Sequence, residues 1–128
     1  MIIAVTAIIT CAGKGERAGF GYNKLLKDLG GITPFEKVVS TFAKNENIDD
    51  IIITCSPEDQ EIFKSKCQGL GVNATFVCGG ATRTQSVGNA LNIVPDGNIV
   101  LVHDGARAFV SQEIITNRSE ERRVGKEC

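Results

Sequence analysis

Residues 2–19 read IIAVTAIITCAGKGERAG, an apolar strand that runs directly into a glycine-rich loop. Glycines let backbone N–H groups approach an anion closely and can turn successive amides inward. Arg17 lies in the loop and Lys24 follows seven residues later, so two full positive charges join the partial charges of the amides. The alternative, in which the glycines only turn the chain, leaves these cations unexplained. The stretch therefore predicts a polyphosphate pocket, although it is neither a Walker A loop nor a complete dinucleotide-binding fingerprint.

The composition describes a single domain that is not built for nucleic acid or for a membrane. The 128 residues carry a net charge of −1, few aromatic residues and no Trp, so a nucleic-acid-binding surface is not expected. Five cysteines without a C-x-x-C pair, and a single histidine, give no usual zinc ligand set. An odd number of cysteines without a signal peptide indicates a reducing cytoplasm. The apolar N-terminal run is shorter than the roughly 20 residues that cross a bilayer.

Apolar, β-branched runs alternate with helix-length amphipathic segments along the chain. Strands that are apolar on both faces and are joined by helices predict a mostly parallel sheet. We therefore expect a Rossmann-like three-layer α/β/α fold. Ser56 is expected to cap the second helix, and Gly69 and Gly71 are expected to end it. The expected strands are 2–10, 50–55, 73–78 and 98–103, and the expected helices are 35–44, 57–68 and 83–93.

Two further loops follow strands at the carboxyl edge of the predicted sheet, where ligands bind in such folds. Gly79 and Gly80 come after the third strand, and Ser86 lies in the first turns of the next helix. Asp104 and Arg107 follow the fourth strand. Taken singly, these residues could be a turn, a helix-start hydroxyl and a local ion pair. Together they indicate a site, whereas His103 has no visible partner and is expected to be a partly buried strand end.

These blocks resemble the 2-C-methyl-D-erythritol 4-phosphate cytidylyltransferase family. The resemblance covers residues 2 to about 117 and is carried by the motifs A-G-x-G-x-R at 12–17, G-G-x-x-R-x-x-S-V at 79–87 and L-V-H-D-x-A-R at 101–107. It implies a nucleotidyltransferase fold and an enzyme that moves CMP from CTP to a sugar-alcohol phosphate with release of pyrophosphate. It also implies a homodimer, and Mg²⁺ bound mainly through the CTP phosphates.

The resemblance also assigns roles to single residues. It implies that Arg17 and Lys24 are catalytic, because they would hold the phosphates and stabilise charge as the α-phosphorus becomes five-coordinate. The other residues would bind substrate: Ala12, Gly13 and Gly15 the triphosphate, Gly79, Gly80 and Ser86 the cytosine, Asp104 the ribose and reacting phosphate, and Arg107 the acceptor phosphate.

The chain departs from the family in its motifs and in its length. Thr10-Cys11 stands where the family often has Pro-Ala, and Ala108 stands where it often has Pro. Family members continue for roughly as many residues again, with a dimer arm and a second catalytic lysine that this chain does not match. We therefore expect impaired turnover. Two other functions remain open: a ribitol 5-phosphate or other sugar-phosphate cytidylyltransferase, and a non-catalytic α/β nucleotide-binding module.

The last residues have a different character from the rest. Residues 118–128 read RSEERRVGKEC and match, residue for residue, the translation of a common short-read sequencing adapter. The alternative is a charged helical tail on the surface. We expect residues 1–117 to be the N-terminal part of a CTP-binding nucleotidyltransferase domain and residues 118–128 to be an artefactual tail.

Overall fold

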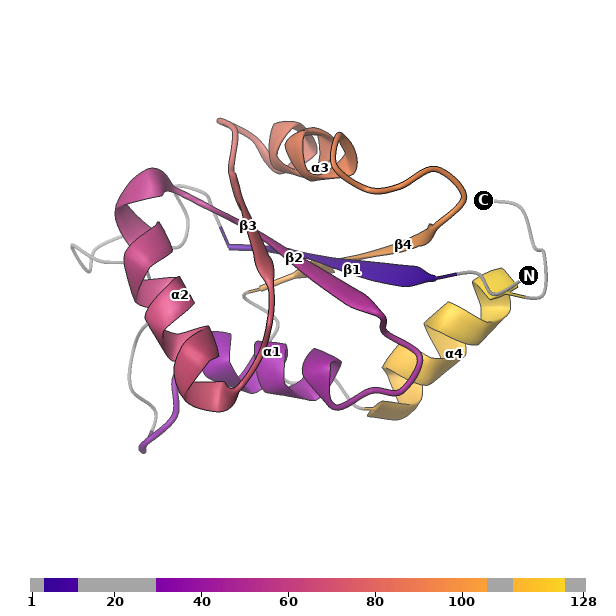
Figure 1. Ribbon diagram of the computed structural model, residues 1–128, viewed down its shortest axis with the longest axis horizontal. Helices are drawn as coiled ribbons and strands as arrows, with labels where there is room; N and C mark the ends of the chain where they lie inside the picture. The colour runs from indigo at the N-terminus through magenta and orange to yellow at the C-terminus, as the bar shows by residue number, and fades with distance from the viewer. Residues whose placement is uncertain (1–3, 12–29, 106–111, 124–128) are drawn as a thin grey trace.

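The computed structural model describes residues 4–11, 30–105 and 112–123, and Figure 1 shows how their helices and strands are arranged. Each expected strand and helix is present within a few residues of its predicted bounds, and a further helix follows the last strand. The strands are β1 (Val5–Thr10), β2 (Asp50–Cys55), β3 (Thr75–Cys78) and β4 (Ile99–Asp104). The helices are α1 (Pro34–Ala43), α2 (Pro57–Leu70), α3 (Arg83–Leu91) and α4 (Gln112–Arg123).

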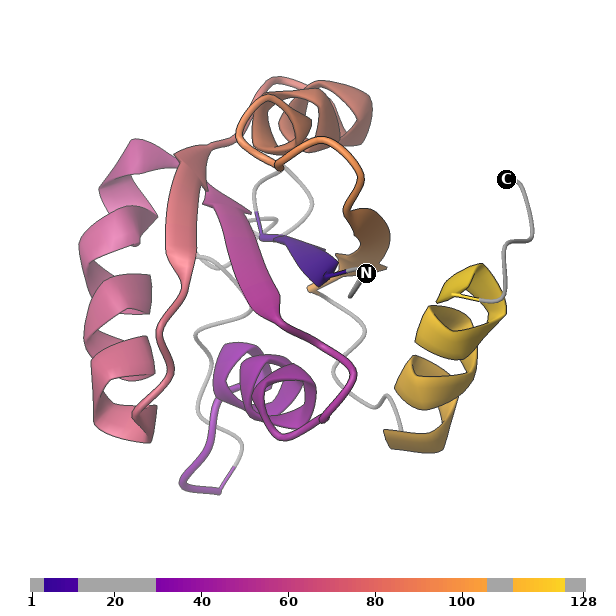
Figure 2. The same cartoon turned by 45° about the vertical axis from the view of Figure 1, so that its right-hand side comes forward.

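The strands form one parallel sheet with the order β3-β2-β1-β4. Helices α1, α2 and α4 cover one face of this sheet, and α3 covers the other (Figure 2). The predicted three-layer α/β/α architecture with a parallel sheet is therefore confirmed. Since all four strands run the same way, their carboxyl ends lie at one edge.

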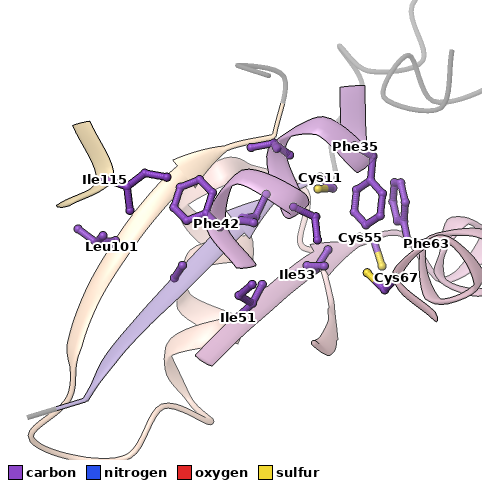
Figure 3. Packing of buried hydrophobic residues seen from close by; sticks show 14 of the residues in the cluster. Cys11, Phe35, Phe42, Ile51, Ile53, Cys55, Phe63, Cys67, Leu101 and Ile115 are labelled. Carbon is purple, nitrogen blue, oxygen red and sulfur yellow. The ribbon is translucent and has the colours of Figure 1, made fainter. Parts of the chain in front are cut away.

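The core is divided between the two faces because successive residues of a strand point to opposite sides. The larger cluster lies under α1, α2 and α4 and takes alternate residues from the strands, such as Ile51 and Ile53 (Figure 3). Within it the rings of Phe35 and Phe63 stack with centroids 4.2 Å apart. The smaller cluster, under α3, contains Ile8 from β1, Ile52 from β2 and Ala90 from α3. Burial on both faces explains why the central strands β1 and β2 read as largely apolar runs.

Local sequence signals set most helix ends, with one correction. Gly71 ends α2 in the left-handed conformation, with φ of 72°, as predicted. The prediction that Gly69 also ends this helix is wrong, because Gly69 lies within α2. Ser56 stands at the N-cap as predicted, but its hydroxyl donates to the Asp59 carboxylate (2.9 Å) instead of capping a backbone amide.

Helix α4 is joined to α1 through a buried amide. Asn45 is 6% exposed, and its Nδ2 donates to Gln112 Oε1 (2.9 Å) and Thr116 Oγ1 (3.1 Å). Gln112 in turn donates to the carbonyl of Thr41 (2.7 Å). The helix continues past residue 118 to Arg123, and the artefactual origin of residues 118–128 stays a prediction. Within the described ranges, no helix is both long and apolar enough to cross a membrane.

A capping box at the start of α1 makes the stability of the fold depend on pH. Thr33 accepts from the backbone of Glu36, and the Glu36 carboxylate accepts in return from the backbone of Thr33, at 3.2 Å each. Lys66 lies 3.4 Å from the same carboxylate. Burial opposes the ionised form, but the Thr33 hydrogen bonds and the Lys66 ammonium outweigh it and lower the pKa of Glu36 below its ordinary 4.5.

Replacing the Glu36 carboxylate should therefore lower the unfolding free energy only at pH values at which the carboxylate is ionised. Glu36→Gln keeps an acceptor for the capping box but removes the charge, and we expect a loss of about 0.5–1 kcal/mol in unfolding free energy at neutral pH. Because the folded pKa is lowered, the contribution is present above 4.5 and disappears as the pH falls through the lowered value. Urea unfolding of the original chain and of Glu36→Gln, at neutral pH and well below pH 4.5, measures this contribution to the unfolding free energy.

The exposed Glu61 on α2 provides the control, and Glu61→Gln is expected to leave the unfolding free energy unchanged at both pH values. A loss in Glu36→Gln that persists undiminished at the lower pH would show that the charge is not its cause.

Candidate functional site

The carboxyl edge of the sheet gathers part of the predicted site. Gly79, Gly80, Ser86 and Asp104 are described: the two glycines follow β3, Asp104 is the last residue of β4, and Ser86 lies in the first turn of α3. The other predicted site residues are outside the described residues: Ala12, Gly13, Gly15, Arg17, Lys24 and Arg107.

Two of the predicted loops leave the sheet from neighbouring strand ends. Thr10 of β1 pairs with Asp104 of β4, and the Gly105 amide donates to the Thr10 carbonyl at 2.9 Å. The chain order β1-β2-β3 runs outward on one side of β1, whereas β4 returns to its other side. This is the point where strand order reverses, and ligands of open α/β sheets bind outside the strand ends there. The glycine-rich segment after β1 and the segment containing Arg107 both start at this point.

The loop after β3 is held in place by polar side chains of α3. The Gly80 amide donates to Ser86 Oγ (3.0 Å), and the Ala81 amide donates to Gln85 Oε1 (2.7 Å). Asn89 Nδ2 donates to the Cys78 carbonyl (3.0 Å). One face of α3 therefore fixes the backbone at Cys78, Gly80 and Ala81, at and just after the end of the strand.

Glycine is required at position 80 because of a close approach. A Cβ at this position would overlap the Cβ of Gln85 and lie 3.3 Å from the Gln85 carbonyl carbon. A positive φ is not the reason for this glycine, because Gly80 is not among the described glycines with positive φ. The missing side chain thus lets the loop pack directly onto the first turn of α3.

Ser86 of α3 contacts the protein backbone of this loop. Ser86 is fully buried and its hydroxyl accepts from Gly80, while Thr82 is the residue that caps α3, accepting from the Gln85 amide at 3.1 Å. The alternative of a helix-start hydroxyl thus applies to Thr82 rather than to Ser86. Contact between Ser86 and cytosine stays a prediction.

The end of β4 borders a polar cavity with two arginines. The cavity has a volume of about 400 Å³ and is lined by Arg83, Val102, His103, Asp104 and Arg118. Two guanidinium groups outnumber one carboxylate, so the cavity favours an anionic ligand. Arg118 belongs to the predicted artefactual tail, which leaves Arg83 as the arginine that stands in the family motif.

His103 is a packed side chain, as expected from the sequence. It is 5% exposed, and its ring lies against Phe42 with centroids 5.1 Å apart. The ring borders the polar cavity described above, but little of its surface reaches solvent.

Sequence reasoning missed Gln85, Asn89 and Arg83. The spacing Thr82-x-x-Gln85 is that of a capping box, and this signal could have drawn attention to Gln85. Arg83 stands inside the quoted family motif but received no role. Nothing in the sequence alone marks Asn89, because its hydrogen bond depends on how α3 folds back over β3.

Known proteins match this chain over most of its length. The family model described as 2-C-methyl-D-erythritol 4-phosphate cytidylyltransferase matches residues 5–127. The enzymes of that name from Clostridium tetani and Bacillus cytotoxicus are 36% and 38% identical over 112 residues, 86% of this chain and 46% and 50% of theirs. The chain therefore spans about half the length of these relatives.

Solved structures agree with the sequence relatives. The 4-diphosphocytidyl-2C-methyl-D-erythritol synthase of Anaerococcus prevotii superposes with a TM-score of 0.80 at 30% identity, covering 94% of this chain and 51% of that one. A CMP:2-keto-3-deoxy-manno-octonic acid synthetase complexed with CTP has a TM-score of 0.75 at 14% identity, over 95% of this chain and 48% of that one, which shows the shared fold. The chain belongs to the 2-C-methyl-D-erythritol 4-phosphate cytidylyltransferase family.

Proposed function

We propose that the protein containing this chain transfers CMP from CTP to 2-C-methyl-D-erythritol 4-phosphate and releases pyrophosphate. Family membership supports the reaction. The observation that carries the proposal for this chain is the loop after β3, where Ser86 and Gln85 hold the amides of Gly80 and Ala81 at the same edge of the sheet as the strand-order reversal. A loop held in one conformation keeps its remaining hydrogen-bonding groups in fixed positions, which helps it to favour the edge of one base over another.

The reaction needs positioning and charge stabilisation more than covalent catalysis. An oxygen of the acceptor phosphate, already anionic near neutral pH, attacks the α-phosphorus of CTP, and the bond to the bridging oxygen of the leaving pyrophosphate breaks. Arg17 and Lys24 are proposed to stabilise the charge that builds up, and Arg107 to hold the acceptor phosphate. The remaining proposed contacts are Ala12, Gly13 and Gly15 to the triphosphate, Gly79, Gly80 and Ser86 to cytosine, and Asp104 to the ribose and reacting phosphate.

Mg²⁺ is proposed as the cofactor, bound mainly through the phosphates of CTP. Among the described residues no three His, Cys, Asp or Glu side chains are close enough to hold a metal ion by themselves. Mg²⁺ usually keeps several water ligands and binds through substrate phosphates with one or two carboxylates, and Asp104 is the described carboxylate at the strand end that could serve. When bound, the ion would neutralise charge on the phosphates.

The whole protein is proposed to act as a homodimer.

The present chain matches only about half the length of its curated relatives. We therefore expect the 128-residue chain to bind CTP but to turn it over poorly, because the other half of the relatives' length has no counterpart here.

Base selectivity tests the proposal. We expect the 128-residue chain, in the presence of Mg²⁺, to bind CTP at least about tenfold more tightly than UTP or GTP, since a site built to hydrogen-bond one base edge leaves groups unpaired with another. Isothermal titration calorimetry measures the three affinities. Pyrophosphate release by a full-length protein, with 2-C-methyl-D-erythritol 4-phosphate and with ribitol 5-phosphate, then identifies the acceptor.

Equal affinity for the three nucleotides would contradict the proposal and favour a non-catalytic nucleotide-binding module. Selective binding of CTP together with a preference for ribitol 5-phosphate would assign the protein to the other class of cytidylyltransferase.

A further inference from the structure

Two cysteines face each other at the carboxyl ends of β2 and β3. Cys55 and Cys78 are the last residues of their strands and are partners in the parallel register. The amide of Gly79, the next residue, donates to the Cys55 carbonyl at 2.9 Å. Neighbouring strands lie about 4.8 Å apart, which falls within the Cα separation of roughly 4.4–6.8 Å that disulfides span. Register partners also project their side chains to the same face, so the two thiols lie on one side of the sheet.

The two thiols differ in their access to solvent. Both are free, Cys55 is 1% exposed, and Cys78 is exposed. Burial, followed by the nearby Asp59 and Cys78, raises the pKa of the Cys55 thiol to about 12, and Lys64 opposes this only in part. Cys55 is therefore a protonated, shielded thiol at neutral pH, and an oxidant in solution meets Cys78 first.

We propose that Cys55 and Cys78 are a redox-sensitive pair whose oxidation to a disulfide shifts the Gly79–Gly80 loop and lowers nucleotide affinity. The effect on nucleotide rests on the proposed function, whereas formation of the disulfide does not. Nothing in the cytidylyl-transfer scheme uses either sulfur atom, so the pair would act on the site from outside the reaction.

The coupling to the loop follows from the connections of Cys78. A disulfide holds its two Cβ atoms about 3.8 Å apart, closer than neighbouring strands place them. Cys78 must therefore move toward β2 when the bond forms. The Cys78 carbonyl accepts a hydrogen bond from Asn89. The Gly79 amide donates to the Cys55 carbonyl, and the Gly80 amide donates to Ser86. A shift at Cys78 is thus transmitted directly to the two glycines.

The oxidation can be written with a peroxide as the oxidant. The Cys78 thiolate attacks a peroxide oxygen, the O–O bond breaks, and a sulfenic acid and hydroxide result. The Cys55 sulfur, after losing its proton, attacks the Cys78 sulfur, so that the S–S bond forms and the S–O bond breaks. The two hydroxide ions released in these steps take up the two protons that the thiols lost and become water. In sum, two thiols and one hydrogen peroxide give one disulfide and two waters, and a dithiol reverses the change.

The test uses the purified 128-residue chain treated with dilute hydrogen peroxide, then alkylated, digested and mapped by mass spectrometry. We expect a peptide that links Cys55 to Cys78, which the mapping separates from any bond to Cys128. We also expect changed hydrogen exchange over residues 79–88 and a loss of CTP affinity of about tenfold, both restored by dithiothreitol. Cys78→Ser should abolish all three effects, and Cys67→Ala, which changes a buried thiol on α2, should retain them.

Absence of the linked peptide would overturn the proposal, as would an equal loss of affinity in Cys78→Ser after oxidation. If the reduced chain does not bind CTP, the proposed function fails. The linked peptide together with altered exchange at 79–88 would then still support the thiol pair, and their absence would still overturn it.

Discussion

Gly80→Ala is expected to weaken the binding of CTP to this chain by about 100-fold. The new methyl group would overlap the Cβ of Gln85, an atom that cannot move without the first turn of α3. Either the loop or the helix must shift, and the hydrogen bonds from Gly80 to Ser86 and from Ala81 to Gln85 would be distorted or lost. Displacements of about 1 Å in a positioned site cost this much. Calorimetric titration with CTP and Mg²⁺ measures the change.

A second glycine in the same helix provides the control. Gly88 is exposed in the interior of α3, and a Cβ there meets nothing within 4 Å. Gly88→Ala should leave CTP affinity unchanged and stabilise the fold by about 0.5–1 kcal/mol, because alanine is the better helix former. Unaltered CTP affinity in Gly80→Ala would show that the loop after β3 takes no part in nucleotide binding, whatever happens to stability.

The fold was largely predictable because burial on both faces leaves a plain signature in the sequence. The run Ile51-Ile52-Ile53 within β2 is apolar on both faces, as is typical of parallel strands that lie between two helix layers. The choice between Gly69 and Gly71 as the end of α2 was not predictable in the same way. Both glycines can adopt positive φ, and which of them does so is decided by the contacts of the last turn, where Val72 donates back to Cys67.

The candidate site was predictable in its place but not in its contacts. Residues that follow parallel strands must share an edge, so the sequence alone could bring Gly80 and Asp104 to the same side of the sheet. Whether Ser86 would face a base or the loop depends on the angle at which α3 meets β3, which no local pattern encodes. For the same reason Arg83 and Asp104 border one cavity although they come from different elements.

Phe63→Ala is expected to lower the unfolding free energy by about 3–5 kcal/mol and the melting temperature by roughly 10–20 °C. Phe63 is fully buried and stacks on Phe35, so the substitution removes a large apolar surface and leaves a cavity between α1 and α2 (Figure 3). Domains of this size have only about 5–15 kcal/mol in total, and a substantial fraction of the protein would then unfold near body temperature. Urea and thermal unfolding followed by circular dichroism measure the loss.

The preceding residue on α2 separates this packing effect from helix propensity. Ile62 is 46% exposed, and Ile62→Ala makes a comparable change to the helix without opening the core, so its cost should stay below about 1 kcal/mol. The Phe35–Phe63 stack lies where α1 and α2 meet over the ends of β1 and β2, and its loss should also loosen the strand end that carries Cys55. If both alanine variants unfold at the same temperature, the stacked pair cannot be what holds these two helices against the sheet.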